Sequence, residues 1–245
     1  MTEHACMYIG ADGIGVALRR GWHQPVIAAA WHAHADSSAA GIIDTLGQAL
    51  ATLGAVRRVQ LRLASPLLRL ALMPFDRATA NPAVEAALAC TLIEKNFGLA
   101  PGSQRIAVSP ACFGRPRLIA AMDEDRAAMI EAAISGSGRE LVAMLPAAAA
   151  AFAAAFRQAS APGTFALPEA DRLLLIDHDG IGPESIRVRP WSPGETLPAL
   201  APGRQGLCAS ENVRADNGWQ TVMLPQPRWL TRVADPRILL ATCGD

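Results

Sequence analysis

Two segments that share the tetrapeptide D-G-I-G constrain the fold more than any other feature of this sequence. Residues 8–15 read YIGADGIG and residues 175–182 read LIDHDGIG. In each, an apolar run enters a glycine-containing turn and a second apolar run follows. Glycine is the usual residue where a chain turns tightly, so each segment predicts a strand, a turn and a returning strand. They are either two ordinary hairpins or the matching starts of two lobes.

The pattern between and beyond these segments alternates strands with helices, which predicts an α/β protein. Capping residues and glycines mark the ends of four helices. The helices are expected over 39–54, 81–98, 124–138 and 147–158. Further strands are expected over 25–34, 57–65, 67–75, 105–110, 117–123, 140–146, 186–191 and 219–225.

The same pattern predicts two lobes of unequal content. We expect a first lobe over residues 1–158 with an inserted subdomain at about 57–122. The stretch 159–170 is rich in small residues and proline and has the composition of a linker. The second lobe, 171–245, is expected to open with RLLLIDHDG and to be reduced, because no full helical unit recurs after Trp191.

The composition of the chain argues against several classes of function. Lys+Arg and Asp+Glu are both 22, so no net field favours nucleic acid as a partner. The five cysteines form no C-x-x-C pair, which argues against a zinc site and fits a reducing cytoplasm. No apolar stretch is long enough for a membrane span and no signal peptide is evident, so a cytoplasmic protein that meets a membrane only through partners is expected.

Of the enzymatic functions that short motifs could indicate, one stays open. The glycines of residues 10–15 are followed by a strand rather than by a helix, which argues against a dinucleotide site. The pair His32 and His34 lacks a third metal ligand. Asp177 and Asp179 resemble the strand-end carboxylates of haloacid dehalogenase-like phosphatases, and a magnesium-dependent phosphatase with Asp177 as nucleophile stays open on this ground.

The order of elements resembles the actin-like ATPase fold, an RNase H-like architecture of two lobes with mixed sheets flanked by helices. Residues 57–190 more specifically resemble the PilM-like and GspL-like cytoplasmic proteins of type IV pilus and type II secretion assembly platforms. The shared features are an ALMPF-type strand, a helix with an acidic residue in its later half, RLIAAMD before a helix, and ELVAMLP leading into an alanine-rich helix.

This resemblance implies a phosphate-binding turn at the start of each lobe, and the chain departs from both turns. The first would contain Asp12, Gly13 and Gly15 but has neither the hydroxyl nor the lysine of that family. The second would contain Asp177, Asp179 and Gly180, with Asp179 where a glycine would admit phosphate. An added carboxylate repels polyphosphate unless Mg²⁺ intervenes. We therefore expect degenerate turns, no catalytic residues, no metal and no cofactor.

The leading hypothesis is a non-catalytic actin-like scaffold of a bacterial pilus or type II secretion assembly platform. The scaffold binds protein partners, and a homodimer stays open. Trp191, Trp219 and Trp229 are candidate interface anchors, because aromatic side chains carry much interface energy. For Trp219, packing of a loop onto the core is the competing interpretation. An active Mg-ATP-binding member of the fold, with Asp12, Asp177 and Asp179 around the metal, is the other alternative.

Overall fold

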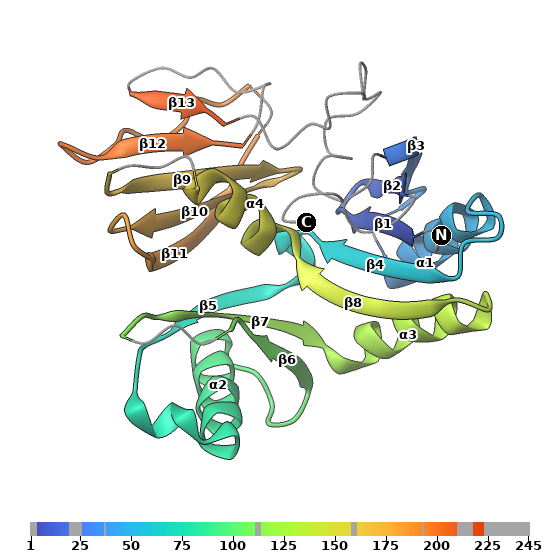
Figure 1. Cartoon of the computed structure of the whole chain (residues 1–245), viewed down its shortest axis with the longest axis horizontal. Helices are drawn as coiled ribbons and strands as arrows, with labels where there is room; N and C mark the ends of the chain where they lie inside the picture. Colours follow the sequence, from blue (N-terminus) through green and yellow to red (C-terminus); the bar gives the residue numbers. More distant parts are fainter. Residues whose placement is uncertain are drawn as a thin grey trace.

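The computed structural model describes residues 4–19, 26–36, 38–110, 114–157, 161–192, 194–209 and 218–222. These residues form three sheets, of five, three and five strands, with helices packed on them (Figure 1). The arrangement confirms the α/β class and the two-lobed architecture. The three-stranded sheet forms a smaller subdomain inserted in the first lobe.

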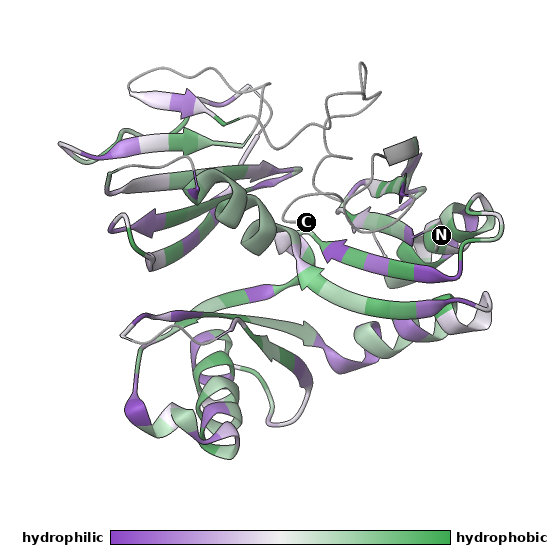
Figure 2. Cartoon of the chain, in the orientation of Figure 1, coloured by the Kyte–Doolittle hydropathy of each residue, from purple (hydrophilic) through white to green (hydrophobic). Residues whose placement is uncertain are grey.

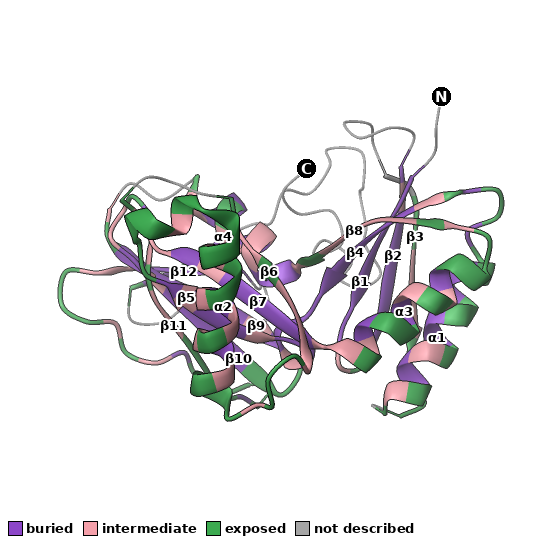
Figure 3. Ribbon diagram, turned by 90° about the horizontal axis from the view of Figure 1, so that it is seen from below, coloured by how far each residue is buried: buried purple, intermediate pink, exposed green. Residues whose placement is uncertain are grey.

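The first lobe is a mixed five-stranded sheet in the order β3-β2-β1-β4-β8. Its strands are β1 (His4–Ile9), β2 (Gly13–Arg19), β3 (Val26–Ala33), β4 (Arg58–Leu63) and β8 (Glu140–Pro146). The first three form an antiparallel meander, and β1, β4 and β8 run parallel. Helices α1 (Ala39–Ala51) and α3 (Glu124–Gly136) contact each other beside this sheet, and Figure 3 shows their exposed outer surfaces.

Local capping explains where these helices begin. The Ser38 hydroxyl accepts the Gly41 N–H at 3.1 Å at the start of α1. The Asp123 carboxylate accepts the Arg126 N–H at 3.3 Å at the start of α3. Both side chains satisfy an amide that the helix itself leaves without a partner.

The inserted subdomain packs one helix on an antiparallel sheet in the order β5-β7-β6. Its elements are η1 (Ser65–Leu67), β5 (Arg69–Met73), η2 (Arg77–Ala80), α2 (Pro82–Phe97), β6 (Gln104–Val108) and β7 (Arg117–Asp123). Met73, Ile93 and Ile119 are fully buried in its small core. The subdomain starts later than the predicted residue 57, because β4 pairs with β1 in the first sheet.

The second lobe is a mixed sheet in the order β11-β10-β9-β12-β13. Its strands are β9 (Gly163–Glu169), β10 (Arg172–His178), β11 (Pro183–Pro190), β12 (Gln205–Cys208) and β13 (Trp219–Thr221). The alanine-rich helix α4 (Ala147–Phe156) connects β8 to this lobe and contacts β9 (Figure 1). No helix among the residues described is long and apolar enough to cross a membrane.

The two five-stranded sheets repeat one topology. In each, an antiparallel meander is followed by two strands that run parallel to its first strand, so β9, β10 and β11 correspond to β1, β2 and β3. The first strand of the second lobe is therefore β9, which lies inside the stretch predicted as a linker. That prediction is wrong over residues 163–169, and the lobe opens one strand earlier than expected.

Candidate functional site

The turn between β1 and β2, here called the first turn, is closed by its own hydrogen bonds. The Gly10 N–H donates to the Gly13 carbonyl at 2.8 Å. The Gly10 carbonyl in turn accepts from Nε2 of His34, 3.1 Å away, and the Asp12 carbonyl accepts the His34 N–H at 3.0 Å. His34 thus binds the first turn to the end of β3 rather than forming a metal site with His32.

The glycine at position 13 makes room for a side chain of the protein itself. A Cβ atom there would lie 2.5 Å from the Trp31 ring and 2.6 Å from the His32 carbonyl oxygen. Gly15 pairs with Tyr8 on one side and with Trp31 on the other. The absence of a side chain at Gly13 therefore serves close packing of an indole against the hairpin.

The turn that corresponds to it in the second lobe lies between β9 and β10 and is called the second turn. Glu169 pairs directly with Arg172, so only Ala170 and Asp171 form the loop. Ala170 has φ of 45°, in the left-handed region that hairpin turns of this length require. The second turn contains no glycine and carries two carboxyl groups, at Glu169 and Asp171. Neither property suits close approach of a phosphate.

Glu169 uses its carboxyl group to join the lobes. It is 3 % exposed, accepts the Ser65 N–H at 2.9 Å, and accepts the Ser65 and Tyr8 hydroxyls, the latter at 3.2 Å. Tyr8 belongs to β1 and Ser65 follows β4, so both partners come from outside the second lobe. Burial raises the pKa of Glu169 to about 7, against the opposing effect of the Ser65 N–H and the Tyr8 hydroxyl.

The D-x-D-G segment forms a different turn from the one expected. It connects β10 to β11 and is called the acidic turn; it lies at the opposite end of β10 from the second turn. A strand of seven residues separates the two turns by about 20 Å, since each residue advances about 3.3 Å. Asp177, Asp179 and Gly180 therefore do not occupy the turn that starts the second lobe, and this part of the site prediction is wrong.

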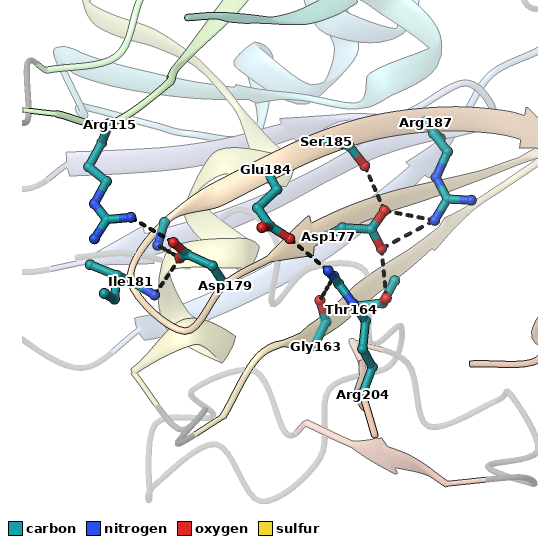
Figure 4. Close-up of polar contacts among 11 residues, drawn as sticks. Arg115, Gly163, Thr164, Asp177, Asp179, Ile181, Glu184, Ser185, Arg187 and Arg204 are labelled. Carbon is teal, nitrogen blue, oxygen red and sulfur yellow. Dashed lines mark hydrogen bonds and ion pairs between the residues drawn. The ribbon is translucent and has the colours of Figure 1, made fainter. Parts of the chain in front are cut away.

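The carboxylate of Asp179 is bound within the acidic turn (Figure 4). It accepts the N–H groups of Ile181 and Gly182, both at 2.8 Å, and an N–H of Arg115 at 2.6 Å. These two backbone bonds and the Arg115 charge hold the pKa of Asp179 below its usual value. Arg115 comes from the subdomain, so Asp179 ties the second lobe to it. Gly180 has φ of 87° and supplies the turn conformation.

Asp177 is equally occupied on the neighbouring strand (Figure 4). Its oxygens accept the Thr164 hydroxyl at 2.7 Å and the Ser185 hydroxyl at 2.6 Å, and they pair with Arg187 at 2.9 Å. Burial acts to raise the pKa of Asp177, but these hydroxyls and Arg187 outweigh it and lower the pKa. A phosphatase nucleophile needs an oxygen directed at substrate, whereas this carboxylate links three strands.

The side chain of His178, between the two acids in sequence, is 1 % exposed and points away from them into an aromatic cluster. The rings of Phe152 and Phe156 on α4 lie 6.0 and 5.2 Å from its imidazole. Burial, aided by the charge of Arg204, lowers the pKa of His178 and favours the neutral ring. His178 therefore acts as a core residue.

The remaining predicted site residues are also accounted for by packing. Among the residues described, no group of three histidines, cysteines or acids is placed to hold a metal ion, so Asp12, Asp177 and Asp179 are not grouped as the alternative Mg-ATP hypothesis required. Trp191 and Trp219 are 6 % and 5 % exposed in the core of the second lobe, and Nε1 of Trp219 donates to the Pro198 carbonyl. They are core residues rather than surface anchors. Trp229 lies outside the described residues.

A groove that the sequence did not indicate separates the first lobe from the subdomain. It has a volume of about 350 Å³. Its lining is mostly apolar: Gln60, Arg62, Ala107, Val108, Ser109, Pro110, Leu118, Ala120, Leu145, Pro146, Ala149, Ala150 and Ala153. Polar and apolar residues alternate along β4, as the colours of Figure 2 show, and the two-residue period of a strand brings Gln60 and Arg62 to one face. We call this feature the lobe groove.

Two features make the lobe groove suitable for a polypeptide. Oε1 of Gln60 is buried without a hydrogen-bond partner among the described residues, although a buried acceptor ordinarily has one. Among the strands that the structure describes, the flanking strands β6 and β8 are both edge strands of their sheets. An edge strand offers unpaired backbone groups to an added chain.

Comparison with known proteins identifies the fold. No family model and no curated protein matches the sequence. Among solved structures, the cytoplasmic domain of EpsL, an inner membrane component of the type II secretion system of Vibrio cholerae, is similar with a TM-score of 0.61 and 14% identity, covering 98% of this chain and 93% of that one.

Two further structures show the same fold. A protein from Bacteroides thetaiotaomicron with an actin-like ATPase fold and unknown function has a TM-score of 0.55 at 9% identity, covering 78% of this chain and 70% of that chain. A chain of the PilM-PilN type IV pilus biogenesis complex has a TM-score of 0.55 at 17% identity, over 76% of this chain and 60% of that one. The predicted actin-like fold and its likeness to GspL-like and PilM-like structures are confirmed.

Proposed function

We propose that this protein is a non-catalytic actin-like scaffold of a bacterial pilus or type II secretion assembly platform, in which the turns that bind phosphate in the resembling fold instead hold the molecule together. The observation that carries the proposal is Glu169. Its buried carboxyl group starts the second turn and bonds Ser65 and Tyr8, so the residue that would face a phosphate is engaged by the rest of the protein.

The first turn supports the same conclusion. Gly13 seats the Trp31 ring and His34 bonds Gly10, so this turn too is used in packing. The residues of the first turn include no lysine or hydroxyl side chain to contact a phosphate. Phosphate sites in proteins depend on free backbone N–H groups and on cationic or hydroxyl side chains.

The protein partners of the similar structures suggest where such a scaffold acts. EpsL is an inner membrane component of a secretion system, and PilM occurs in a complex with PilN. We infer that this chain works on the cytoplasmic side of the inner membrane and binds a partner of the PilN kind. The occupant we assign to the lobe groove is an extended segment of that partner, whose backbone would pair with an edge strand and donate to Gln60.

Thermal unfolding with and without millimolar Mg-ATP tests the loss of nucleotide binding. A ligand at 100 times its dissociation constant stabilises a protein by about 2.7 kcal/mol, which for this size raises the melting temperature by roughly 5–10 °C. We expect no shift. Magnesium with inorganic triphosphate shows whether any shift comes from the phosphates alone. A rise with either ATP or triphosphate would contradict the proposal.

A pair of matched substitutions tests the lobe groove. Leu145 lines it and is 38 % exposed, while Met129 on α3 is 41 % exposed and lies outside it. We expect Leu145→Glu to abolish binding of a purified PilN-type protein, and Met129→Glu to leave binding intact, as measured by calorimetry. Equal binding by both variants and the wild type would remove the groove from the proposal.

A further inference from the structure

A second concave surface lies on the junction of the subdomain and the second lobe. It has a volume of about 430 Å³ and is formed by η1, β5, the middle of β11 and the ends of α2, α3 and β10 that lie nearest to them. β5 and β11 contact each other beside it, as Figure 1 shows. The residues on which the argument rests are Arg69, Phe97, Arg126, Arg172, Ile186 and Val188. We call this surface the arginine cleft.

Few carboxylate groups lie close to the three arginines of the arginine cleft. Arg69 donates to the neutral amide oxygen of Gln104 at 3.1 Å. Nε of Arg172 is 4.0 Å from the exposed carboxylate of Asp171. The guanidinium of Arg126 makes no hydrogen bond or ion pair with any residue the structure describes, and none of the residues lining the cleft is acidic.

This contrasts with three arginines at the acidic turn and beside it. Arg115, Arg187 and Arg204 each lie within 2.9 Å of a carboxylate oxygen. The chain as a whole has equal numbers of acidic and basic residues. Positive charge gathered in one cleft of an otherwise balanced protein favours an anionic ligand, and guanidinium groups bind carboxylates in a fixed two-bond geometry.

The cleft also exposes apolar side chains next to these charges. Phe97 at the end of α2 is 42 % exposed and Val188 on β11 is 44 % exposed. Ile186 lies two residues before Val188, on the same face of β11, and also lines the cleft. A small inorganic anion would leave these side chains in water. A polypeptide that carries both carboxylates and aliphatic side chains would cover them and neutralise the arginines together.

We propose that the arginine cleft is a docking site for an acidic segment of a partner protein in which aspartate or glutamate alternates with leucine-like residues. It is separate from the lobe groove, because the two surfaces share none of their lining residues. The inference does not depend on loss of nucleotide binding or on the identity of the partner in the lobe groove.

Fluorescence anisotropy with a labelled synthetic peptide of alternating glutamate and leucine tests the charge. We expect saturable binding that weakens about tenfold in Arg126→Gln and that falls with added salt. Arg77→Gln removes the same charge from an exposed site of the subdomain and is expected to bind as the wild type does. Circular dichroism of each variant establishes that it is folded. Equal binding of a glutamine–leucine peptide, or equal weakening by both substitutions, would overturn the proposal.

A second pair of variants tests whether the ligand of the cleft is a peptide or a simple anion. Val188→Ser removes an exposed apolar group from the cleft, whereas Val84→Ser removes one of similar exposure, 41 %, from α2 outside it. We expect only Val188→Ser to weaken peptide binding, by about threefold or more. Unchanged binding by Val188→Ser, or displacement of the peptide by millimolar inorganic phosphate, would indicate a site for small anions and would refute the proposed peptide docking.

Discussion

The buried carboxyl group of Glu169 makes the stability of the protein depend on pH in a way that one substitution should remove. Burial raises the pKa of Glu169 from its ordinary 4.5 to about 7. Between these values the folded protein holds a proton that the unfolded chain releases. The stabilisation that this bound proton gives the folded protein is fully present below pH 4.5 and is lost as the pH rises through 7. The pKa difference corresponds to about 3 kcal/mol in the free energy of unfolding.

Glu169→Gln should keep the contacts and abolish the titration. The amide oxygen can accept both donors of Ser65, and the amide nitrogen can donate to the Tyr8 oxygen, since a hydroxyl both donates and accepts. We expect the variant to match or exceed the wild type in stability above pH 7. Its advantage should shrink by about 3 kcal/mol as the pH falls to 4.5.

Urea unfolding of both proteins from pH 4.5 to 8.5 gives the required difference. Asp177, Asp179 and His178 titrate in the wild type and the variant alike, so their effects cancel when the two curves are subtracted. Glu140→Gln, at a side chain 68% exposed, provides the control and should leave the shape of the profile unchanged. Parallel curves for the wild type and Glu169→Gln would refute the reasoning.

Three further substitutions test other contacts, each by urea or thermal unfolding. Gly13→Ala should lower the free energy of unfolding by about 2–4 kcal/mol, because the added methyl group meets an indole ring and a backbone carbonyl. Gly47→Ala, in helix α1 with no atom within 4 Å, is the control and should raise it by up to about 1 kcal/mol. Equal effects of the two substitutions would show that steric contact is not the cause. Arg117→Ala should cost about 1–3 kcal/mol, because the partly buried Glu85 loses its ion-pair partner, and an unchanged midpoint would contradict this. Asp179→Ala should cost about 1 kcal/mol through two unpaired turn amides, and no loss would mean that water replaces the carboxylate.

The elements with strong local signals were predictable from the sequence. Asn81 caps α2 directly before Pro82, and Gly98, with φ of 63°, ends it, so the sequence marked both ends of this helix correctly. The two D-G-I-G hairpins also form as expected. Their strands alternate or run apolar over enough residues for the period to be read.

The site prediction is wrong because the sequence of β9 gives no strand signal. β9 holds Pro168 and is flanked by small residues, which resemble a linker, although Thr164 to Leu167 pair fully with β10. A lobe predicted without β9 opens with β10, which places Asp177 and Asp179 in the wrong turn. The role of Glu169 could not be predicted from a motif, because it depends on Ser65, which is far away in sequence.

The parallel pairing of β4 with β8 has a consequence for how the chain folds. The whole subdomain and α3 lie between these two neighbouring strands in sequence. During synthesis, the edge of β4 therefore stays open until most of the first lobe has left the ribosome, while the subdomain can complete its local sheet and helix earlier. A subdomain that folds first brings the ends of β4 and β8 together and lowers the entropic cost of closing that loop. The insertion then acts as a folding aid for the sheet that it interrupts.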